Sequence, residues 1–275
     1  MTRRKAVVWS VVTLLCILLA IYGYVVVPYN RFDPESVSES EPITVSRDAR
    51  LLARVVHDTS FLDEWKKSIG IRPTFRMEVW DLDVGTCKVG REVGTGYANA
   101  VAFAPDGRRL AVSGQAGRKG FLLEVDAATG RVLRRGSGAP HLGRFLQYAP
   151  SGEYLLCVGA MPTERLYAAC GGPKCEVQFQ VWAVAGWRRK CQWRTGNKET
   201  DVETVAISPD SKRAVLSAGS VRRTDTMLLV DFESCLVREM NVERNRYHVA
   251  AFDSSGRRVA FYWSDGRVVY WDLTA

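Results

Sequence analysis

The sequence predicts an all-β repeat fold behind a single N-terminal helix, and three observations predict it. A strand-turn-strand pattern recurs five times, each copy continues into a third apolar run, and an uncharged apolar segment precedes all the copies. In the best formed copy, residues 101–112, two apolar runs meet at the turn Pro105-Asp106-Gly107. Proline presets the backbone angle of the first turn centre, and Asp followed by Gly accommodates the conformation that comes next.

The copies recur at a regular spacing. Their turn positions fall at residues 48, 106, 151, 210 and 255, so the steps are 58, 45, 59 and 45 residues, with insertions in the longer copies. This spacing is in the range of tandem supersecondary units. The runs on either side of each turn are rich in Val, Ala, Leu and aromatic residues, which predicts hairpin-linked strands. A third run, usually closed by Asp, and a weaker fourth run predict four strands per copy.

Four short antiparallel strands cannot bury their apolar faces alone, so the copies must stack face to face. Radial stacking predicts a β-propeller of about five four-stranded blades over residues 43–275. The last copy has no fourth run of its own. The ring is therefore expected to be a tight five, an open ring or a ring completed by a second chain through self-association. An antiparallel sandwich is the alternative architecture.

The copies resemble the WD-repeat family, whose blades share the Pro-Asp-Gly hairpin and a Trp-Asp close of the third strand. The resemblance is strongest at residues 101–112 and 264–272. No Gly-His dipeptide precedes an inner strand, Val125 and Val230 stand in place of Trp, and Ala183 stands in place of Asp. The hydrogen-bond network of the family is therefore not carried over, and the copies look closer to degenerate bacterial propeller repeats. The resemblance implies a scaffold that binds an unknown protein partner.

The first 27 residues predict a transmembrane signal-anchor helix. Residues 1–5 contain Arg3, Arg4 and Lys5, and the 22 residues 6–27 carry no charge. A helix of that length is about 33 Å long, which spans a bilayer. Because the apolar run is long and lacks an Ala-x-Ala site, we favour an uncleaved anchor over a cleaved secretory signal.

Positive flanks of a membrane helix stay in the cytoplasm. The basic tip is therefore expected to be cytoplasmic and the propeller extracytoplasmic, in a single-pass membrane protein. Residues 28–42 are rich in Ser and Glu and predict an acidic linker between the two.

Residues 43–275 are basic, with 34 Lys and Arg against 26 Asp and Glu. Several of the cations flank the hairpin turns, which share one face in a propeller, and they predict a basic face formed by Arg50, Arg108, Arg109, Lys212, Arg213, Arg257 and Arg258. Such a face can meet anionic lipid headgroups or an acidic partner, or it can serve solubility alone. Nucleic acid is disfavoured by the predicted compartment and the lack of a recognition motif.

Two long insertions separate the second and third runs of the first and third copies, at residues 57–74 and 160–176. In the first insertion, Phe61, Trp65 and Ile69 recur at helical spacing between a capping residue and a stop. A short helix is expected there. Its apolar side either packs on the propeller or binds a partner, because long loops on a rigid frame are where binding residues concentrate.

The second insertion contains Cys170 and Cys175 on either side of a Gly-Gly-Pro turn. The turn brings the two cysteines within disulfide reach, and an oxidising compartment would preserve the bond. A zinc site that includes Cys157 and Cys191 is the alternative, but the spacing lacks the tight Cys-x-x-Cys pairs of such sites. Cys157 and Cys191 either pair across neighbouring strands or are simply buried.

No complete catalytic motif is present. The histidines His57, His141 and His248 are scattered, and the sequence has no phosphate loop, nucleophile elbow or zinc-protease motif. We therefore predict no catalytic residue, no metal site and no cofactor. The alternative is a propeller hydrolase or lyase whose carboxylates come together in the central channel, since such pairing is spatial and does not show in a sequence.

Overall fold

The computed structural model describes residues 42–57, 73–117, 119–140, 142–162, 175–194, 202, 204–220, 223–240, 247–263 and 266–273. These residues form 19 β-strands in five antiparallel sheets, which we number 1 to 5 in chain order. The expected anchor helix over residues 6–27 lies outside the described residues. Within the ranges given above, no helix is long and apolar enough to cross a membrane.

Each sheet is a meander in which consecutive strands pair, as the five repeats predicted. Sheet 1 contains β1 (Ile43–Val45), β2 (Leu51–His57), β3 (Thr74–Asp81) and β4 (Thr86–Thr95). Sheet 2 contains β5 (Tyr97–Phe103), β6 (Arg109–Ala116), β7 (Lys119–Asp126) and β8 (Val132–Ala139). Sheet 3 contains β9 (Leu142–Tyr148), β10 (Tyr154–Pro162), β11 (Cys175–Ala183) and β12 (Arg188–Arg194).

Sheet 4 contains β13 (Val205–Ile207), β14 (Arg213–Ser220), β15 (Arg223–Asp231) and β16 (Val237–Met240). Sheet 5 contains β17 (Tyr247–Phe252), β18 (Arg258–Trp263) and β19 (Val268–Asp272). In the part of the chain that the structure describes, sheet 5 therefore has three strands where the other sheets have four. This agrees with the missing fourth run of the last copy.

The turn between the first and second strands has the same backbone geometry in all five sheets. One residue of each turn has a positive φ between 58° and 77°, at Ala49, Gly107, Gly152, Ser211 and Gly256. The preceding Asp closes the turn in sheets 2 and 4. The Oδ1 atom of Asp106 accepts the backbone N–H of Arg108 at 2.9 Å, and that of Asp210 accepts the N–H of Lys212 at 3.0 Å. The five predicted hairpin turns are confirmed.

The turn between the third and fourth strands also recurs. Its first residue is the Asp that closes the third run in sheets 1, 2 and 4, and this carboxylate accepts backbone N–H groups of the turn. Four residues after that position, φ is positive at Gly85, Gly130, Trp187 and Cys235. The same turn therefore places different side chains beside the outer strand of each sheet, and in sheet 4 it places a cysteine.

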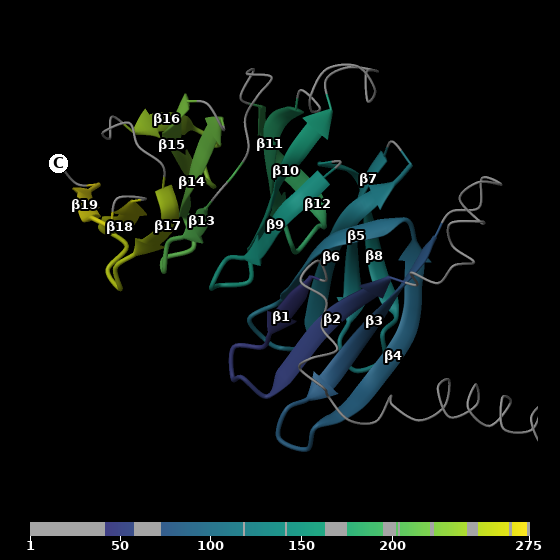
Figure 1. The fold of residues 1–275 in the computed structure, drawn as a ribbon. Helices are drawn as coiled ribbons and strands as arrows, with labels where there is room; N and C mark the ends of the chain where they lie inside the picture. The colour runs from purple at the N-terminus through teal and green to yellow at the C-terminus, as the bar shows by residue number, and fades with distance from the viewer. Residues whose placement is uncertain are drawn as a thin grey trace, which may run out of the picture.

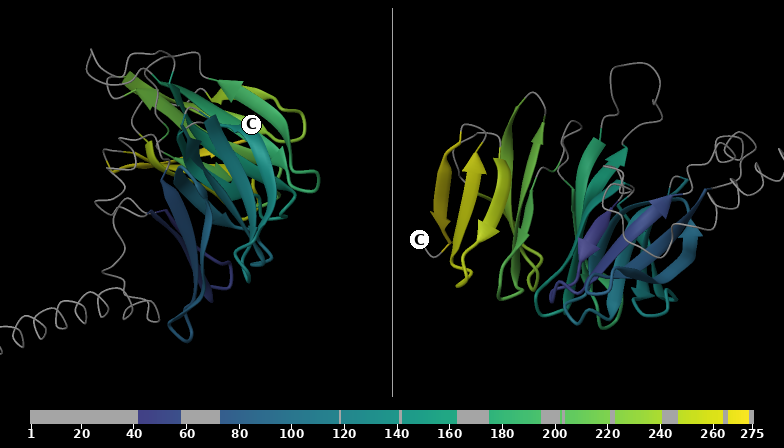
Figure 2. Two further views of the ribbon diagram at one scale, coloured as in Figure 1. Left: turned by 90° about the vertical axis from the view of Figure 1, so that its right-hand side faces the viewer. Right: turned by 60° about the horizontal axis from the view of Figure 1, so that its bottom comes forward.

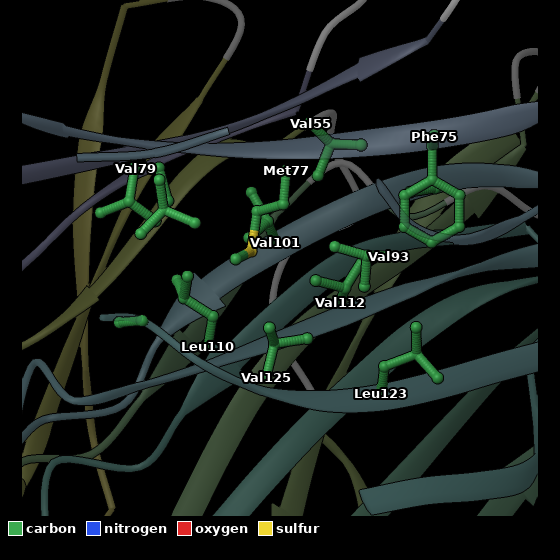
Figure 3. Close-up of a cluster of buried hydrophobic side chains, with 14 of the residues drawn as sticks. Val55, Phe75, Met77, Val79, Val93, Val101, Leu110, Val112, Leu123 and Val125 are labelled. Atoms are coloured by element: carbon green, nitrogen blue, oxygen red, sulfur yellow. The ribbon is translucent and has the colours of Figure 1, made fainter. Parts of the chain in front are cut away.

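Neighbouring sheets pack face to face through apolar side chains. Between sheets 1 and 2, Phe75 and Met77 of β3 meet Leu110 and Val112 of β6, and all four are at least 99 % buried (Figure 3). The ring of Phe75 also stacks on Phe121 of β7 with centroids 5.5 Å apart. Burial of a side chain of this size contributes about 1.5–3 kcal/mol, so each junction between sheets contributes substantially to stability.

The other junctions use different shapes. Trp182 and Trp187 of sheet 3 pack against alanines of sheet 2, where Gly136 leaves room for the Trp182 ring. Phe179 and Phe232 lie in the core between sheets 3 and 4, and Phe261 lies in the core between sheets 4 and 5. The junctions therefore combine contacts of large side chains with small ones and contacts between aromatic rings, such as Tyr154 of sheet 3 with Phe232.

The five sheets follow one another side by side in an arc, with sheets 1 and 5 at its two ends (Figures 1 and 2). The first strands of successive sheets are in contact, as between β1 and β5, β5 and β9, and β13 and β17. This is the stacking of a β-propeller and not that of a two-layer sandwich. The outer face of sheet 5 remains exposed at Val249, Tyr262, Val268 and Tyr270, with exposed fractions of 45–70 %.

Candidate interaction surface

The hairpin turns of sheets 2 to 5 touch one another along one side of the arc, which we call the turn face. The backbone N–H of Ser151 donates to Ser211 Oγ at 2.8 Å, and Arg213 Nη2 donates to the carbonyl of Gly256 at 2.8 Å. A Cβ added to Gly152 would lie 3.6 Å from Pro105 Cδ. The expectation that these turns share one face is therefore confirmed for four of the five sheets.

Four of the seven cations predicted to form a basic face have carboxylate partners, in the pairs Arg50 with Asp83 (2.9 Å), Arg109 with Asp106 (2.9 Å), Arg213 with Asp210 (3.6 Å) and Arg258 with Asp272 (3.8 Å). Partial burial raises the pKa of Asp106, but hydrogen bonds from Arg108 and Arg109 outweigh it and hold that pKa below its ordinary value. The turn face therefore carries much less uncompensated positive charge than the count of its cations indicates.

The other three predicted cations, Arg108, Lys212 and Arg257, are exposed and equivalent by repeat. Each follows the residue of positive φ, and its carbonyl accepts the backbone N–H of the residue that follows the third strand. No carboxylate of the described chain lies within ion-pair distance of any of the three. Glu153 holds the same position in sheet 3 and interrupts the series.

Two of the buried carboxylates on the third strands, Glu78 and Glu124, are almost inaccessible to solvent, and sequence reasoning missed both. Glu78 is 1 % exposed. Its carboxylate forms ion pairs with Arg54 Nε at 2.8 Å and Arg76 Nη2 at 2.8 Å, and it accepts a hydrogen bond from Trp80 Nε1 at 3.1 Å. A buried carboxylate without such partners would be strongly destabilising. The arginines therefore serve Glu78 as counter-ions.

Glu124 has the corresponding role at the junction of sheets 2 and 3. It is 1 % exposed and pairs with Arg109 Nη1 at 3.1 Å and Arg134 Nε at 3.3 Å. Arg134 Nη1 also donates to the carbonyl of Val184 in sheet 3 at 2.8 Å, so the ion pair reaches across the junction. Burial, together with the charge of Glu124, raises the pKa of the neighbouring Tyr148. The sequence feature that could have identified both carboxylates is a Glu within an otherwise apolar strand.

His57 is the one histidine whose side chain the structure describes. Its Nε2 atom accepts the backbone N–H of Ala98 at 3.0 Å across the junction of sheets 1 and 2, and its ring lies near Phe75 and Tyr97. Burial lowers the pKa of His57. Among the described residues, no three His, Cys, Asp or Glu side chains are grouped so that they could hold a metal ion.

A disulfide joins Cys191 of β12 in sheet 3 to Cys235 in the turn that precedes β16 in sheet 4, with a Cα–Cα distance of 5.6 Å. The sequence left Cys191 between burial, pairing with Cys157 and a zinc site, and none of these alternatives included Cys235. Cys87 and Cys157 are free thiols. Burial raises the pKa of the Cys157 thiol to about 12, which makes it unreactive near neutral pH. The signal for the bond was the repeat itself, which places Cys235 where Gly85 and Gly130 stand.

Several predicted site residues fall outside the described part of the chain, namely Phe61, Trp65, Ile69 and Cys170. Cys175 begins β11, but its side chain is not described. The helical insertion and the Cys170–Cys175 disulfide therefore stay predictions.

No family model matches this sequence, and no curated protein matches it. Its fold does match solved structures, in 1314 chains. One of them is the hydrazine synthase of Kuenenia stuttgartiensis, with a TM-score of 0.58 and 16 % sequence identity over 84 % of this chain and 70 % of the other. At that identity the likeness concerns the fold alone. The described residues therefore form an all-β, repeated, β-propeller-like fold.

Proposed function

We propose that this chain is a membrane-anchored, extracytoplasmic WD-like propeller that acts as a protein-interaction scaffold. The observation that carries the proposal is the Cys191–Cys235 disulfide between two neighbouring sheets. Structural disulfides persist in oxidising compartments and are rare where glutathione and thioredoxin keep thiols reduced. A disulfide that joins repeats therefore supports a location outside the cytosol.

The N-terminal sequence supports the same location. The uncharged residues 6–27 are long enough to span a bilayer, and the preceding Arg3, Arg4 and Lys5 favour a cytoplasmic N-terminus. An anchor in that orientation would place residues 43–275 on the side of the membrane where disulfides form.

The packing of the described residues and the long connections between strands support the scaffold role. The sheets stack through well-packed junctions, and the buried Glu78 and Glu124 are paired with arginines. Residues 58–72 and 163–174 lie between the second and third strands of sheets 1 and 3, and they are far longer than the corresponding connections in sheets 2, 4 and 5. Long connections on a rigid frame are the usual place of binding residues.

Topology and redox state can be tested together in intact cells. Protease added from outside should digest residues 28–275 and spare the N-terminal tip. Thiol alkylation before lysis, followed by non-reducing mass spectrometry, should find the peptides of Cys191 and Cys235 linked to each other. Digestion only after membrane disruption, together with alkylation of both cysteines without reductant, would contradict the proposed location.

The scaffold role itself is tested by cross-linking in membranes and isolation of the full chain. A variant in which residues 58–72 are replaced by a short Gly-Ser connection should lose a partner that the wild type retains. Thermal unfolding midpoints of the wild type and the variant serve as the control for general loss of folding. An identical set of cross-linked proteins for both chains would argue against this insertion as the binding element.

A further inference from the structure

The outer strands of sheets 2 and 3 hold the densest positive charge of the described chain. Neither strand contains an Asp or Glu, over residues 132–139 and 188–194. Seven exposed cations lie on these strands or directly before them, and we call them the outer-rim patch: Arg131, Arg134, Arg135, Arg188, Arg189, Lys190 and Arg194. By contrast, the outer strands of sheets 1 and 4 each include a Glu, at Glu92 and Glu239.

The two strands of the outer-rim patch are the fourth strands, at the edges of sheets 2 and 3. Arg189 Nη1 of β12 donates to the carbonyl of Gly138 in β8 at 3.4 Å. In the other direction, Arg134 of β8 donates to the carbonyl of Val184, at the start of the turn into β12. These two contacts place the cation-bearing strands β8 and β12 along adjoining sheet edges.

Few carboxylates compensate this surface. Within the described residues, only Arg134 of the seven has an ion pair, with the buried Glu124. Lys190 instead lies over the ring of Tyr154, with its Nζ 5.2 Å from the ring centroid. On the turn face, four of the seven predicted cations are paired with carboxylates. Among the described residues, six of the seven cations of the outer-rim patch therefore lack an ion pair, against three of the seven on the turn face.

The strand that carries four of the cations is held in place. Cys191 lies in the middle of β12 and its disulfide to Cys235 ties that strand to sheet 4. A charged surface on a fixed strand loses little conformational entropy when it binds, which favours affinity.

We propose that the outer-rim patch binds the anionic phospholipid headgroups of a bilayer. Six of its seven cations are arginines, whose planar guanidinium group donates paired hydrogen bonds to phosphate oxygens. The patch extends along two strands at the edge of the molecule, and its one exposed large apolar side chain is Leu133, with an exposed fraction of 49 %. Such a surface matches a plane of distributed negative charges.

The short length of the predicted linker also favours a bilayer as the partner, and this step rests on the proposed anchor. A coil as long as the predicted linker over residues 28–42 has a root-mean-square length of about 20 Å. An anchored propeller would therefore remain close to its own bilayer, which raises the effective concentration of headgroups at the patch.

The test uses the full chain in phosphatidylcholine nanodiscs, with flotation of separate vesicles as the readout. The wild type should bind vesicles that contain phosphatidylglycerol, should not bind vesicles of phosphatidylcholine alone, and should lose binding at high salt. The test variant is R135E/R188E/R194E, because none of these three side chains makes a hydrogen bond or ion pair within the described residues. The matched control is R108E/K212E/R257E on the turn face, which changes the net charge by the same amount.

The rim variant should bind phosphatidylglycerol vesicles about 100-fold more weakly, since each cation near an anionic surface contributes about a factor of five. The control should lose less than about threefold, as expected for charges that do not touch the surface. R135Q/R188Q/R194Q should also weaken binding, which guards against loss of folding caused by charge reversal. Thermal unfolding midpoints of all variants report on folding.

Equal losses in the rim and control variants would overturn the proposal, because they would indicate a general effect of net charge. Rim-dependent binding to polyglutamate without binding to phosphatidylglycerol vesicles would also overturn it and would indicate an acidic protein partner. The nanodisc holds the chain whatever its orientation in the cell. A negative vesicle result therefore leaves the protease and alkylation results intact, and a failed topology test leaves the vesicle result interpretable.

Discussion

At the scale of single residues, one turn position imposes the same left-handed backbone on different side chains. Ala49 has a φ of 58° and Gly107, its counterpart in sheet 2, has a φ of 67°. A residue with a Cβ is disfavoured there by about 1–2 kcal/mol, whereas glycine is not. A49G should raise the free energy of unfolding by about 0.5–1 kcal/mol once the greater flexibility of unfolded glycine is included. G107A should lower it by about 1 kcal/mol, because no atom lies within 4 Å of an added Cβ and only the backbone is strained.

Thermal or urea unfolding of the full chain measures both changes. A251G is the matched control, since Ala251 is an exposed residue of β17 outside the positive-φ positions. It should destabilise by about 0.5–1 kcal/mol, as glycine does inside strands. If A49G destabilised the protein as much as A251G, the left-handed geometry at Ala49 would be refuted.

His57 makes one junction between sheets sensitive to pH. Burial lowers the pKa of His57, and its Nε2 atom must be unprotonated to accept the N–H of Ala98. The unfolded chain binds this proton near its ordinary pKa of about 6.5, whereas the folded chain binds it only at lower pH. The titration of His57 therefore leaves stability unchanged above about pH 6.5. As the pH falls from there toward the pKa of His57 in the folded chain, stability decreases by at most about 1.4 kcal/mol per pH unit.

The variant H57Q removes this titration and keeps a side chain that can accept the Ala98 N–H. Unfolding midpoints at about pH 8 and about pH 5 should show a smaller loss of stability on acidification for H57Q than for the wild type. Any contribution of His141 and His248 is common to both proteins and drops out of the comparison. An identical pH dependence would mean that His57 is not the titrating group.

At the scale of elements, the sequence predicts those features that neighbouring residues determine. Pro105, Asp106 and Gly107 suffice to fix a hairpin turn, and the same local chemistry recurs in the other copies. The strands on both sides follow because their apolar runs are short and bounded by such turns. The number of sheets was predictable for this reason, and so were the three strands that sheet 5 has among the described residues.

Features that depend on packing between sheets were not predictable in this way. Cys191 and Cys235 are 44 residues apart and meet only because the turn of sheet 4 lies against the outer strand of sheet 3. The buried Glu124 requires Arg109 and Arg134 from two different strands, one before and one after its own. Likewise, the predicted basic face counted Arg50 and Arg258 as free charges, although Asp83 and Asp272 lie within reach only in the folded sheets.

At the scale of the whole molecule, the arc determines how stability is distributed. Sheets 2, 3 and 4 each have packed neighbours on both sides, whereas the outer face of sheet 5 remains exposed at Val249, Tyr262, Val268 and Tyr270. In a stack of repeats, stability is approximately the sum of the intrinsic stability of each unit and its contacts with its neighbours. Sheet 5 should therefore open before the sheets in the middle of the stack.

Hydrogen exchange of the native full chain tests this distribution. Amides of β17 and β18 should exchange through an opening that is at least about 2 kcal/mol easier than the opening that exposes β6, β7, β10 and β11. F261A removes a fully buried ring between sheets 4 and 5 and should speed exchange in sheet 5 with little effect on sheet 2. L110A, at the junction of sheets 1 and 2, should speed exchange in those two sheets with little effect on sheet 5.

A closed ring would behave differently, because sheet 5 would then be supported on both sides. Equal protection of all five sheets, with F261A accelerating exchange in all of them equally, would show that the arc closes.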